Sequence, residues 1–139
     1  MAKGGSETVM GLIYADVNLS NMQRPELSAL QTRALVDSGA LHLCIPEHVA
    51  LQLQLQELEK REVIVADGNK RLVPYVGPLV VKIANRTSLS GAMVLGDEVL
   101  LGAIPMEDMD LVVRPAMRDV VPNPQNPNFA VSVAKGFRS

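Results

Sequence analysis

The chain has 139 residues, a formal net charge of −2 and 47% hydrophobic residues, which predict a single globular domain. Aromatic residues make up only 3% of the sequence, so we expect a core of aliphatic side chains and methionine. The charge balance and the lack of a long basic run argue against nucleic-acid binding. No apolar stretch approaches the ~18 residues of a membrane span, which argues against a membrane partner.

The N-terminal residues 1–8 are small and polar, and we expect them to be disordered. The first six residues lack the apolar core of a signal peptide. A single cysteine, Cys44, excludes an intrachain disulfide and fits a reducing compartment. These features predict a cytoplasmic protein.

The first part of the chain predicts two strands that lead to a short polar loop. Residues 11–20 alternate apolar and polar, with Ile13, Ala15, Val17 and Leu19 on one face, which is typical of a half-buried strand. A polar connector with a proline follows, and residues 30–36 predict a second strand. That strand ends at Asp37-Ser38-Gly39-Ala40.

The middle of the chain predicts a short helix and a hairpin. Pro46-Glu47 is a good helix opening, since proline suits the first turn and an acidic residue suits its positive end. Residues 51–56 alternate Leu and Gln, which by itself favours a strand. Residues 57–66 predict a strand, and Asp67-Gly68 is a strong hairpin signal.

The later part of the chain predicts several short strands separated by turns, with bends at Pro74, Gly77 and Pro78. Strands are expected at 79–84, 92–95, 99–101 and 110–114, turns at 85–87 and 96–98, and one or two helical turns at 104–109. Short strands with frequent turn signals predict an all-β sandwich or barrel with one or two short helices. The domain then spans residues 9–121. The Pro- and Asn-rich extension 122–139 carries a candidate terminal interface strand at 129–133.

Asp37 stands at the end of an apolar strand beside two small residues. An ionised carboxylate there needs partners, because a low-dielectric surrounding disfavours charge. Ser38 offers a hydroxyl that donates and accepts, and Gly39 allows a tight turn or a close approach of the backbone. Taken alone, the same three residues also suit an ordinary turn at the end of a strand.

The context of this loop resembles the retropepsin-like (clan AA) aspartic proteases. Residues 35–40, Leu-Val-Asp-Ser-Gly-Ala, resemble their active-site signature, and residues 99–102, Val-Leu-Leu-Gly, resemble the second signature. The 65–68 hairpin stands where the family carries its flap. The resemblance runs in family order from residue 11 to residue 121 and looks most like the single-domain prokaryotic members. It implies a closed β-barrel, a helix reaching to residue 53, and an active site at a C2 dimer interface.

The resemblance also implies roles for individual residues. Asp37 would be the catalytic carboxylate, and its loop would be supported by Ser38, Gly39 and Ala40. The flap would be formed by Ala66, Asp67, Gly68, Asn69 and Lys70. Beneath the site would pack Leu101 and Gly102. The mechanism needs two carboxylates that share one proton, and this chain carries one such motif. The second carboxylate would therefore come from another copy, which gives a homodimeric aspartic endopeptidase acting on a peptide or protein substrate. No metal or organic cofactor is implied.

Two departures from the family pattern leave other functions open. Leu41 stands where family members often carry a polar residue, and the hairpin lacks the glycine-rich tip of the viral enzymes. One alternative is a catalytically weak or inactive dimer that binds extended peptide segments, because fold does not fix function. Another is a scaffold whose cleft is filled by Leu41 or the flap.

Other chemistry-bearing residues favour structural roles. His42, Cys44 and His48 lack a recognisable further ligand for zinc, and a Cys44–His42 thiol pair lacks an orienting third group. We therefore expect a structural histidine and a buried cysteine.

Two charged segments are expected to face solvent. The spacing of Glu107, Asp108 and Asp110 does not match a calcium loop, so we expect a solvated face. The run 57–62 mixes charges in the manner of an exposed strand edge, where charge discourages unwanted pairing.

Overall fold

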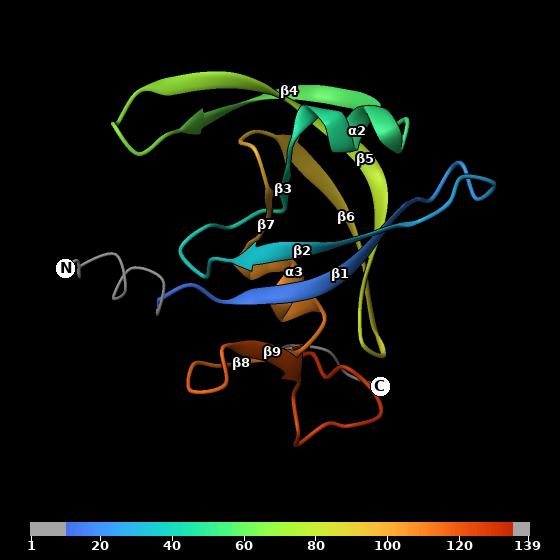
Figure 1. The fold of residues 1–139 in the computed structure, drawn as a ribbon, viewed down its shortest axis with the longest axis vertical. Helices are drawn as coiled ribbons and strands as arrows, with labels where there is room; N and C mark the ends of the chain where they lie inside the picture. The colour runs from blue at the N-terminus through green and yellow to red at the C-terminus, as the bar shows by residue number, and fades with distance from the viewer. Residues whose placement is uncertain (1–10, 135–139) are drawn as a thin grey trace.

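The computed structural model describes residues 11–134, so the predicted disordered segment 1–8 lies outside the described residues. Six strands close into a barrel in the order β1-β2-β7-β3-β6-β5, because β5 pairs back onto β1, and β4 extends the sheet beyond β5 (Figure 1). The strands are β1 (Tyr14–Asn21), β2 (Leu30–Val36), β3 (Cys44–Ile45), β4 (Gln56–Ile64), β5 (Lys70–Ile83), β6 (Arg86–Val94) and β7 (Val99–Leu101). The helices are α2 (Glu47–Gln52) and α3 (Ala103–Asp108), and β8 (Leu111–Arg114) pairs with β9 (Asp119–Pro122) in a small second sheet. The predicted all-β class with two short helices is confirmed.

The barrel encloses an aliphatic core that follows the predicted alternation. Ala15, Val17 and Leu19 on β1 are all buried, and the predicted inward face of this strand is confirmed. Leu79 and Leu101 are fully buried from other strands. Each such leucine stabilises the fold by roughly 1.5–3 kcal/mol relative to an exposed position. The low aromatic content is therefore compatible with a well-filled interior.

Strand β5 is longer than the sequence predicts. We expected bends at Pro74, Gly77 and Pro78 to separate two strands, but one strand runs from Lys70 to Ile83. Its pairing with β4 ends at Gly77, and its pairing with β1 begins at Leu79. The irregular residues therefore mark a corner, with a register shift against β6, where β5 exchanges one partner strand for another. They redirect the strand without ending it.

Strand β6 is also longer than predicted, since it begins at Arg86 where a turn was expected over 85–87. The polar residues Asn85, Arg86 and Thr87 suggested a turn, yet Arg86 and Ser88 are buried. Each has a distant partner: an Arg86 Nη donates to the Asn126 carbonyl, and Ser88 Oγ donates to Asp108 Oδ2 at 2.6 Å, while Arg86 Nε has no hydrogen-bond partner among the described residues. Buried polar groups of this kind persist in a strand when they are hydrogen-bonded.

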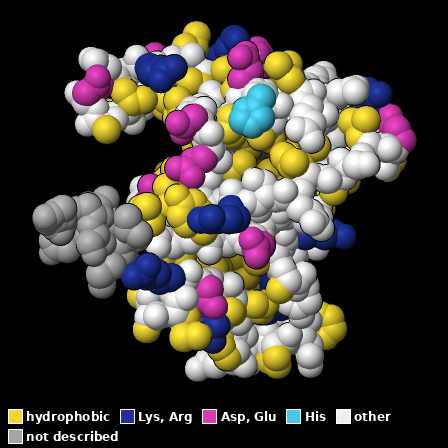
Figure 2. Space-filling model, in the orientation of Figure 1, with side chains coloured by type: hydrophobic (Ala, Val, Ile, Leu, Met, Phe, Trp, Pro, Cys, Tyr) yellow, Lys and Arg dark blue, Asp and Glu magenta, His cyan; other side chains and the backbone are white. Residues whose placement is uncertain are grey.

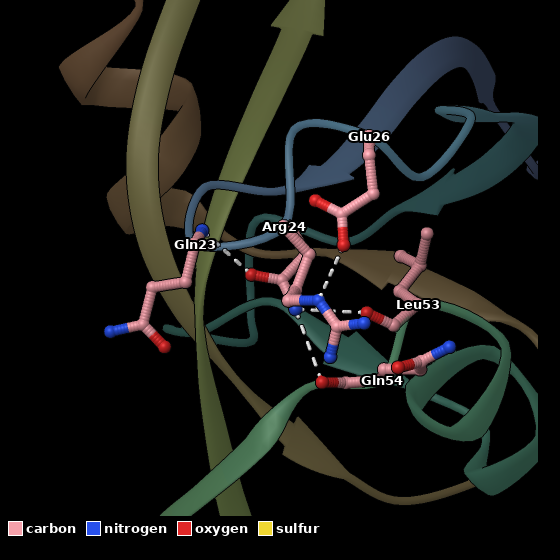
Figure 3. A network of polar contacts seen from close by, with 6 residues as sticks. Gln23, Arg24, Glu26, Leu53 and Gln54 are labelled. Atoms are coloured by element: carbon pink, nitrogen blue, oxygen red, sulfur yellow. Dashed lines mark hydrogen bonds and ion pairs between the residues drawn. The ribbon is translucent and has the colours of Figure 1, made fainter.

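The helix expected to begin at Pro46-Glu47 is confirmed as α2. At the end of β1, Asn21 binds the chain where it leaves this helix. Asn21 is buried, and its Nδ2 donates to the carbonyls of Leu53 at 2.9 Å and Gln54 at 3.1 Å (Figure 3). Its Oδ1 accepts from the Gln23 N–H at 2.8 Å. Gln54 has a φ of 52°, a conformation in which a helix cannot continue. One asparagine therefore fixes the point where the chain turns from α2 into β4.

The C-terminal extension is fastened to the barrel through Asp110. Its carboxylate accepts hydrogen bonds from Asn123 Nδ2 at 3.2 Å, Asn126 Nδ2 at 2.8 Å and the Val131 N–H at 3.1 Å. The expected solvated face therefore holds for Glu107 and Asp108, which are exposed, whereas Asp110 is half-buried and binds the tail. In the described single chain, residues 129–134 form no strand, so the interface strand stays a prediction about an assembly.

We expect this attachment to weaken in acid. The hydrogen bonds to Asp110, from Asn126 first, hold the pKa of its carboxyl below the usual 3.8. A lowered pKa means that the stabilisation is fully present above the pKa of the unfolded chain and is lost as pH falls through the folded pKa. The free energy of unfolding in urea should therefore fall more steeply below about pH 5 for the wild type than for Asp110→Asn. Asp97→Asn, in an exposed turn, is the control, and parallel pH profiles for wild type and Asp110→Asn would contradict this role.

Candidate active site

Asp37 begins a tight loop directly after β2. The Asp37 N–H donates to the Leu101 carbonyl at 3.0 Å, which continues the pairing of β2 with β7 by one residue. The Gly39 N–H donates to Asp37 Oδ1 at 2.9 Å, and the Ala40 N–H donates to the Asp37 carbonyl at 3.2 Å. Asp37, Ser38 and Gly39 are exposed. One oxygen of the carboxylate is therefore held by the Gly39 N–H, while the Asp37 side chain remains exposed to solvent.

The loop rests on the junction between β7 and α3. Strand β7 lies between β2 and β3, the two strands that the loop connects. Behind it, the Ala103 N–H donates to the Ala40 carbonyl at 2.8 Å, and the Ile104 N–H donates to the Leu41 carbonyl at 2.9 Å. A Cβ on Gly102 would lie 2.4 Å from the His42 carbonyl oxygen. Glycine is therefore required here, and Leu101 and Gly102 both contact the segment 37–42.

A row of partly buried side chains crosses the sheet beside the Asp37 loop, and we call it the groove floor. It consists of Leu35, Leu100, Cys44, Met93 and Tyr75, which are paired in register from β2 through β7, β3 and β6 to β5. Their sequence neighbours on each strand fill the barrel core. Because successive side chains in a strand point to opposite faces, the groove floor faces away from that core.

Cys44 is joined to the support of the candidate carboxylate, because it pairs with Leu100, the neighbour of the Leu101 whose carbonyl accepts from the Asp37 N–H. Burial is the main cause that raises the pKa of the Cys44 thiol, and the negative charge of Asp37 raises it further. A thiol that stays protonated is a poor nucleophile and metal ligand. Within residues 11–134, no group of three or more His, Cys, Asp or Glu side chains is placed to hold a metal ion. Cys44 therefore acts as an apolar member of the floor.

The hairpin of β4 and β5 arches over this side of the molecule (Figure 1). At its tip the Gly68 N–H donates to the Val65 carbonyl at 2.8 Å, and the Asn69 N–H donates to Asp67 Oδ1 at 2.9 Å. Gly68 has a φ of 86°, so this turn needs a residue that tolerates the left-handed region. The predicted hairpin is confirmed, with a three-residue loop closed by Val65 and Asn69 where two residues were expected.

Tyr75 joins the base of the hairpin to the groove floor. The Arg61 guanidinium lies 3.7 Å from the centroid of the Tyr75 ring, and Arg61 Nε also donates to Glu59 at 2.7 Å. A Cβ on Gly91 would fall 2.2 Å from the ring, so the ring lies flat against the β6 backbone. Arg61, Tyr75 and Gly91 thus form a three-layer stack that orients the hairpin.

The predicted site residues fall into two groups. Residues 37–40 and the 101–102 segment are in contact, whereas hairpin residues 66–70 lie at an exposed tip that stands away from the Asp37 loop (Figure 1). Figure 2 shows a hollow in the surface on the side where the hairpin projects. The sequence analysis missed the groove floor as a set. Its signal is the alternation within each strand, which places these residues on the face opposite the core.

A comparison of the sequence with protein-family models gave no match, and a comparison with curated proteins gave none either. Among the described residues, no helix has the length and apolar character needed to cross a membrane.

Proposed function

We propose that this chain is an aspartic endopeptidase of the retropepsin-like class, active as a homodimer with one Asp37 from each copy. The observation that carries the proposal is the Asp37 loop. A carboxylate directly follows β2, one of its oxygens accepts the Gly39 N–H at 2.9 Å, and Gly102 supports the loop from behind. An exposed carboxylate on a rigid, backbone-anchored loop is suited to meet a symmetry-related copy of itself.

The proposed chemistry needs only the two carboxyl groups and a water molecule. Two carboxylates in close contact share one proton, because like charges at that distance cannot both ionise. The ionised group takes a proton from the water, whose oxygen attacks the peptide carbonyl carbon, while the protonated group donates to the carbonyl oxygen. The carbon–nitrogen bond then breaks as a proton passes to the leaving nitrogen. The pair titrates as one unit.

The groove floor supports a substrate with apolar side chains on either side of the scissile bond. Its members are apolar or aromatic, and all except the buried Met93 are half-buried. An extended peptide places alternate side chains on one face, where they can contact these apolar groups. Binding without cleavage uses the same floor and is the second candidate function. The test is peptide-library cleavage by wild type and Asp37→Asn, with binding of uncleaved peptides measured on both.

Exposed apolar side chains beside the Asp37 loop support the dimer. Leu41 is 62% exposed and Ile104 is 48% exposed, and their backbones are joined by the hydrogen bond from Ile104 to Leu41. Large apolar residues that cluster on a surface mark interaction sites more often than isolated ones do. A second copy that covers this patch would bring the two Asp37 loops together.

We expect Ile104→Glu to shift the chain toward monomer in sedimentation velocity. Burying an unpaired charge in the interface should weaken dimerisation by roughly tenfold or more, about 1.4 kcal/mol. Leu89→Glu is the matched control, because Leu89 is 60% exposed on β6 and lies away from the Asp37 loop in sequence and pairing. If the two variants dimerise equally well, this patch is not the interface.

A further inference from the structure

A second hollow lies on the outer face of β1 and β2, apart from Asp37. One part is lined mainly by Asp16, Asn18, Gln31, Arg33 and Lys82. An adjoining part is lined by Leu12, Tyr14, Asp16, Arg33 and Arg118. Because Asp16 and Arg33 line both parts, the two form one continuous depression, which we call the outer channel. None of the chemistry proposed above uses it.

Strand register makes the outer channel a continuation of the groove floor. Leu35, at the β2 end of the floor, is paired with Tyr14, and Arg33 is paired with Asp16. Residues two apart on a strand share a face, so Arg33 and Leu35 point to the same side of the sheet. Arg33 precedes Asp37 by four residues, which corresponds to about 13 Å along an extended chain. A bound peptide can therefore contact both places at once.

The charge of the outer channel differs from that of the whole chain. Arg33, Lys82 and Arg118 face one carboxylate, Asp16, although the chain has a net charge of −2. In the part of the chain that the structure describes, the ion pairs within 4.0 Å involve none of these three cations. Figure 2 shows basic side chains on the face that carries β1 and β2 in Figure 1. The channel is thus locally cationic, with its charges available to a ligand.

Stacking on Tyr14 orients the Arg33 guanidinium in a way that suits an anionic partner. Its guanidinium lies 4.0 Å from the centroid of the Tyr14 ring, a stacking contact that fixes the plane of the group. A stacked guanidinium keeps its N–H donors at the edge, where they match the two oxygens of a carboxylate. Asn18 and Gln31, paired across β1 and β2, add neutral donors and acceptors nearby.

We propose that the outer channel binds an acidic segment of the peptide substrate, with carboxylates about four to six residues from the scissile bond, on Arg33 and Lys82. The place of this contact in substrate recognition rests on the proposed endopeptidase function. A peptide fits better than a nucleic acid, because Asp16 in the middle of the channel would repel a continuous line of phosphates.

The test is fluorescence anisotropy with a labelled peptide of about twelve residues, apolar at one end and carrying alternate glutamates at the other. It uses Asp37→Asn as the parent so that no turnover occurs. We expect Arg33→Glu or Lys82→Glu to weaken binding by roughly tenfold, and added salt to weaken binding to the parent because exposed charges are screened. Lys60→Glu, at an exposed cation on β4 outside the proposed sites, should have little effect.

The same measurement separates the channel from the protease function. Equal binding of an all-glutamine peptide, or equal losses in Arg33→Glu and Lys60→Glu, would overturn the channel. Tighter, Arg33-dependent binding of a single-stranded oligonucleotide would also overturn it, in favour of a phosphate chain. If Arg33-dependent binding is found while the wild-type chain cleaves no peptide, the channel stands and the endopeptidase proposal fails. If the wild type cleaves but Arg33→Glu leaves KM for the acidic substrate unchanged, the channel fails alone.

Discussion

Asp37→Asn should abolish peptide cleavage while leaving the fold and the dimer intact. The amide retains an oxygen that accepts the Gly39 N–H, so the loop keeps its hydrogen bond. The amide cannot accept or release the proton that the two carboxyl groups share. Loss of this acid–base catalysis costs roughly 10²–10⁴-fold in rate. The measurement is cleavage of a peptide library from pH 4 to 8 by mass spectrometry, with sedimentation velocity on both proteins.

Asp97→Asn is the matched control for that experiment, because Asp97 is exposed in the turn before β7 and lies outside the loop. It should cleave at the wild-type rate. Equal cleavage by wild type and Asp37→Asn would place the activity elsewhere and end the dyad proposal. If both remain folded dimers and cleave nothing, peptide binding without hydrolysis becomes the better account.

Gly102→Ala should be among the most destabilising single substitutions in the chain. The added Cβ would lie 2.4 Å from the His42 carbonyl oxygen and 2.6 Å from the Leu41 carbonyl carbon. Both are backbone atoms, and the Leu41 carbonyl is also held by its hydrogen bond from Ile104, so neither can rotate away as a side chain could. Overpacking of this kind costs about 3 kcal/mol, and we expect the free energy of unfolding in urea to fall by that amount.

Gly39→Ala separates loop stability from loop chemistry. The nearest atom to a Cβ at Gly39 is Asp37 Oδ1 at 3.2 Å, a side-chain atom on an exposed loop. We expect the free energy of unfolding to change by less than about 1 kcal/mol, while cleavage falls because the carboxylate is displaced.

Equal stability of wild type and Gly102→Ala would show that the Asp37 loop does not depend on the close packing at Gly102.

Local patterns predicted the elements around Asp37 well. Three segments near Asp37 combine an apolar run with a residue that ends it, and each forms the expected element. They are the strands 30–36 and 99–101 and the helix after Gly102. Such signals suffice because each element is specified by its own residues. The strands and the helix around the Asp37 loop were therefore predictable from local sequence, whereas the support by Leu101 and Gly102 was expected only from the family resemblance and the closeness of Gly102 to His42 was not expected.

The remaining features depend on partners far away in the sequence. The first half of β6 was missed because residues 85–87 look like a turn, and the distant partners of Arg86 and Ser88, Asn126 and Asp108, are not visible in the local sequence. The groove floor was missed because its five members come from five strands, and only the register aligns them. No single stretch of sequence contains that information.

The position of β7 between β2 and β3 has a consequence for how the molecule is made. The Asp37 N–H depends on the Leu101 carbonyl, which the ribosome supplies long after the loop itself has been synthesised. Until β7 and α3 have left the exit tunnel, the Asp37 loop has its local hydrogen bonds from Gly39 and Ala40 but lacks the support of β7 and α3. Contacts between distant segments also slow folding, because the chain must close a large loop first. Assembly of the loop therefore waits for β7 and α3, and a chain synthesised only as far as β6 lacks the support that positions Asp37.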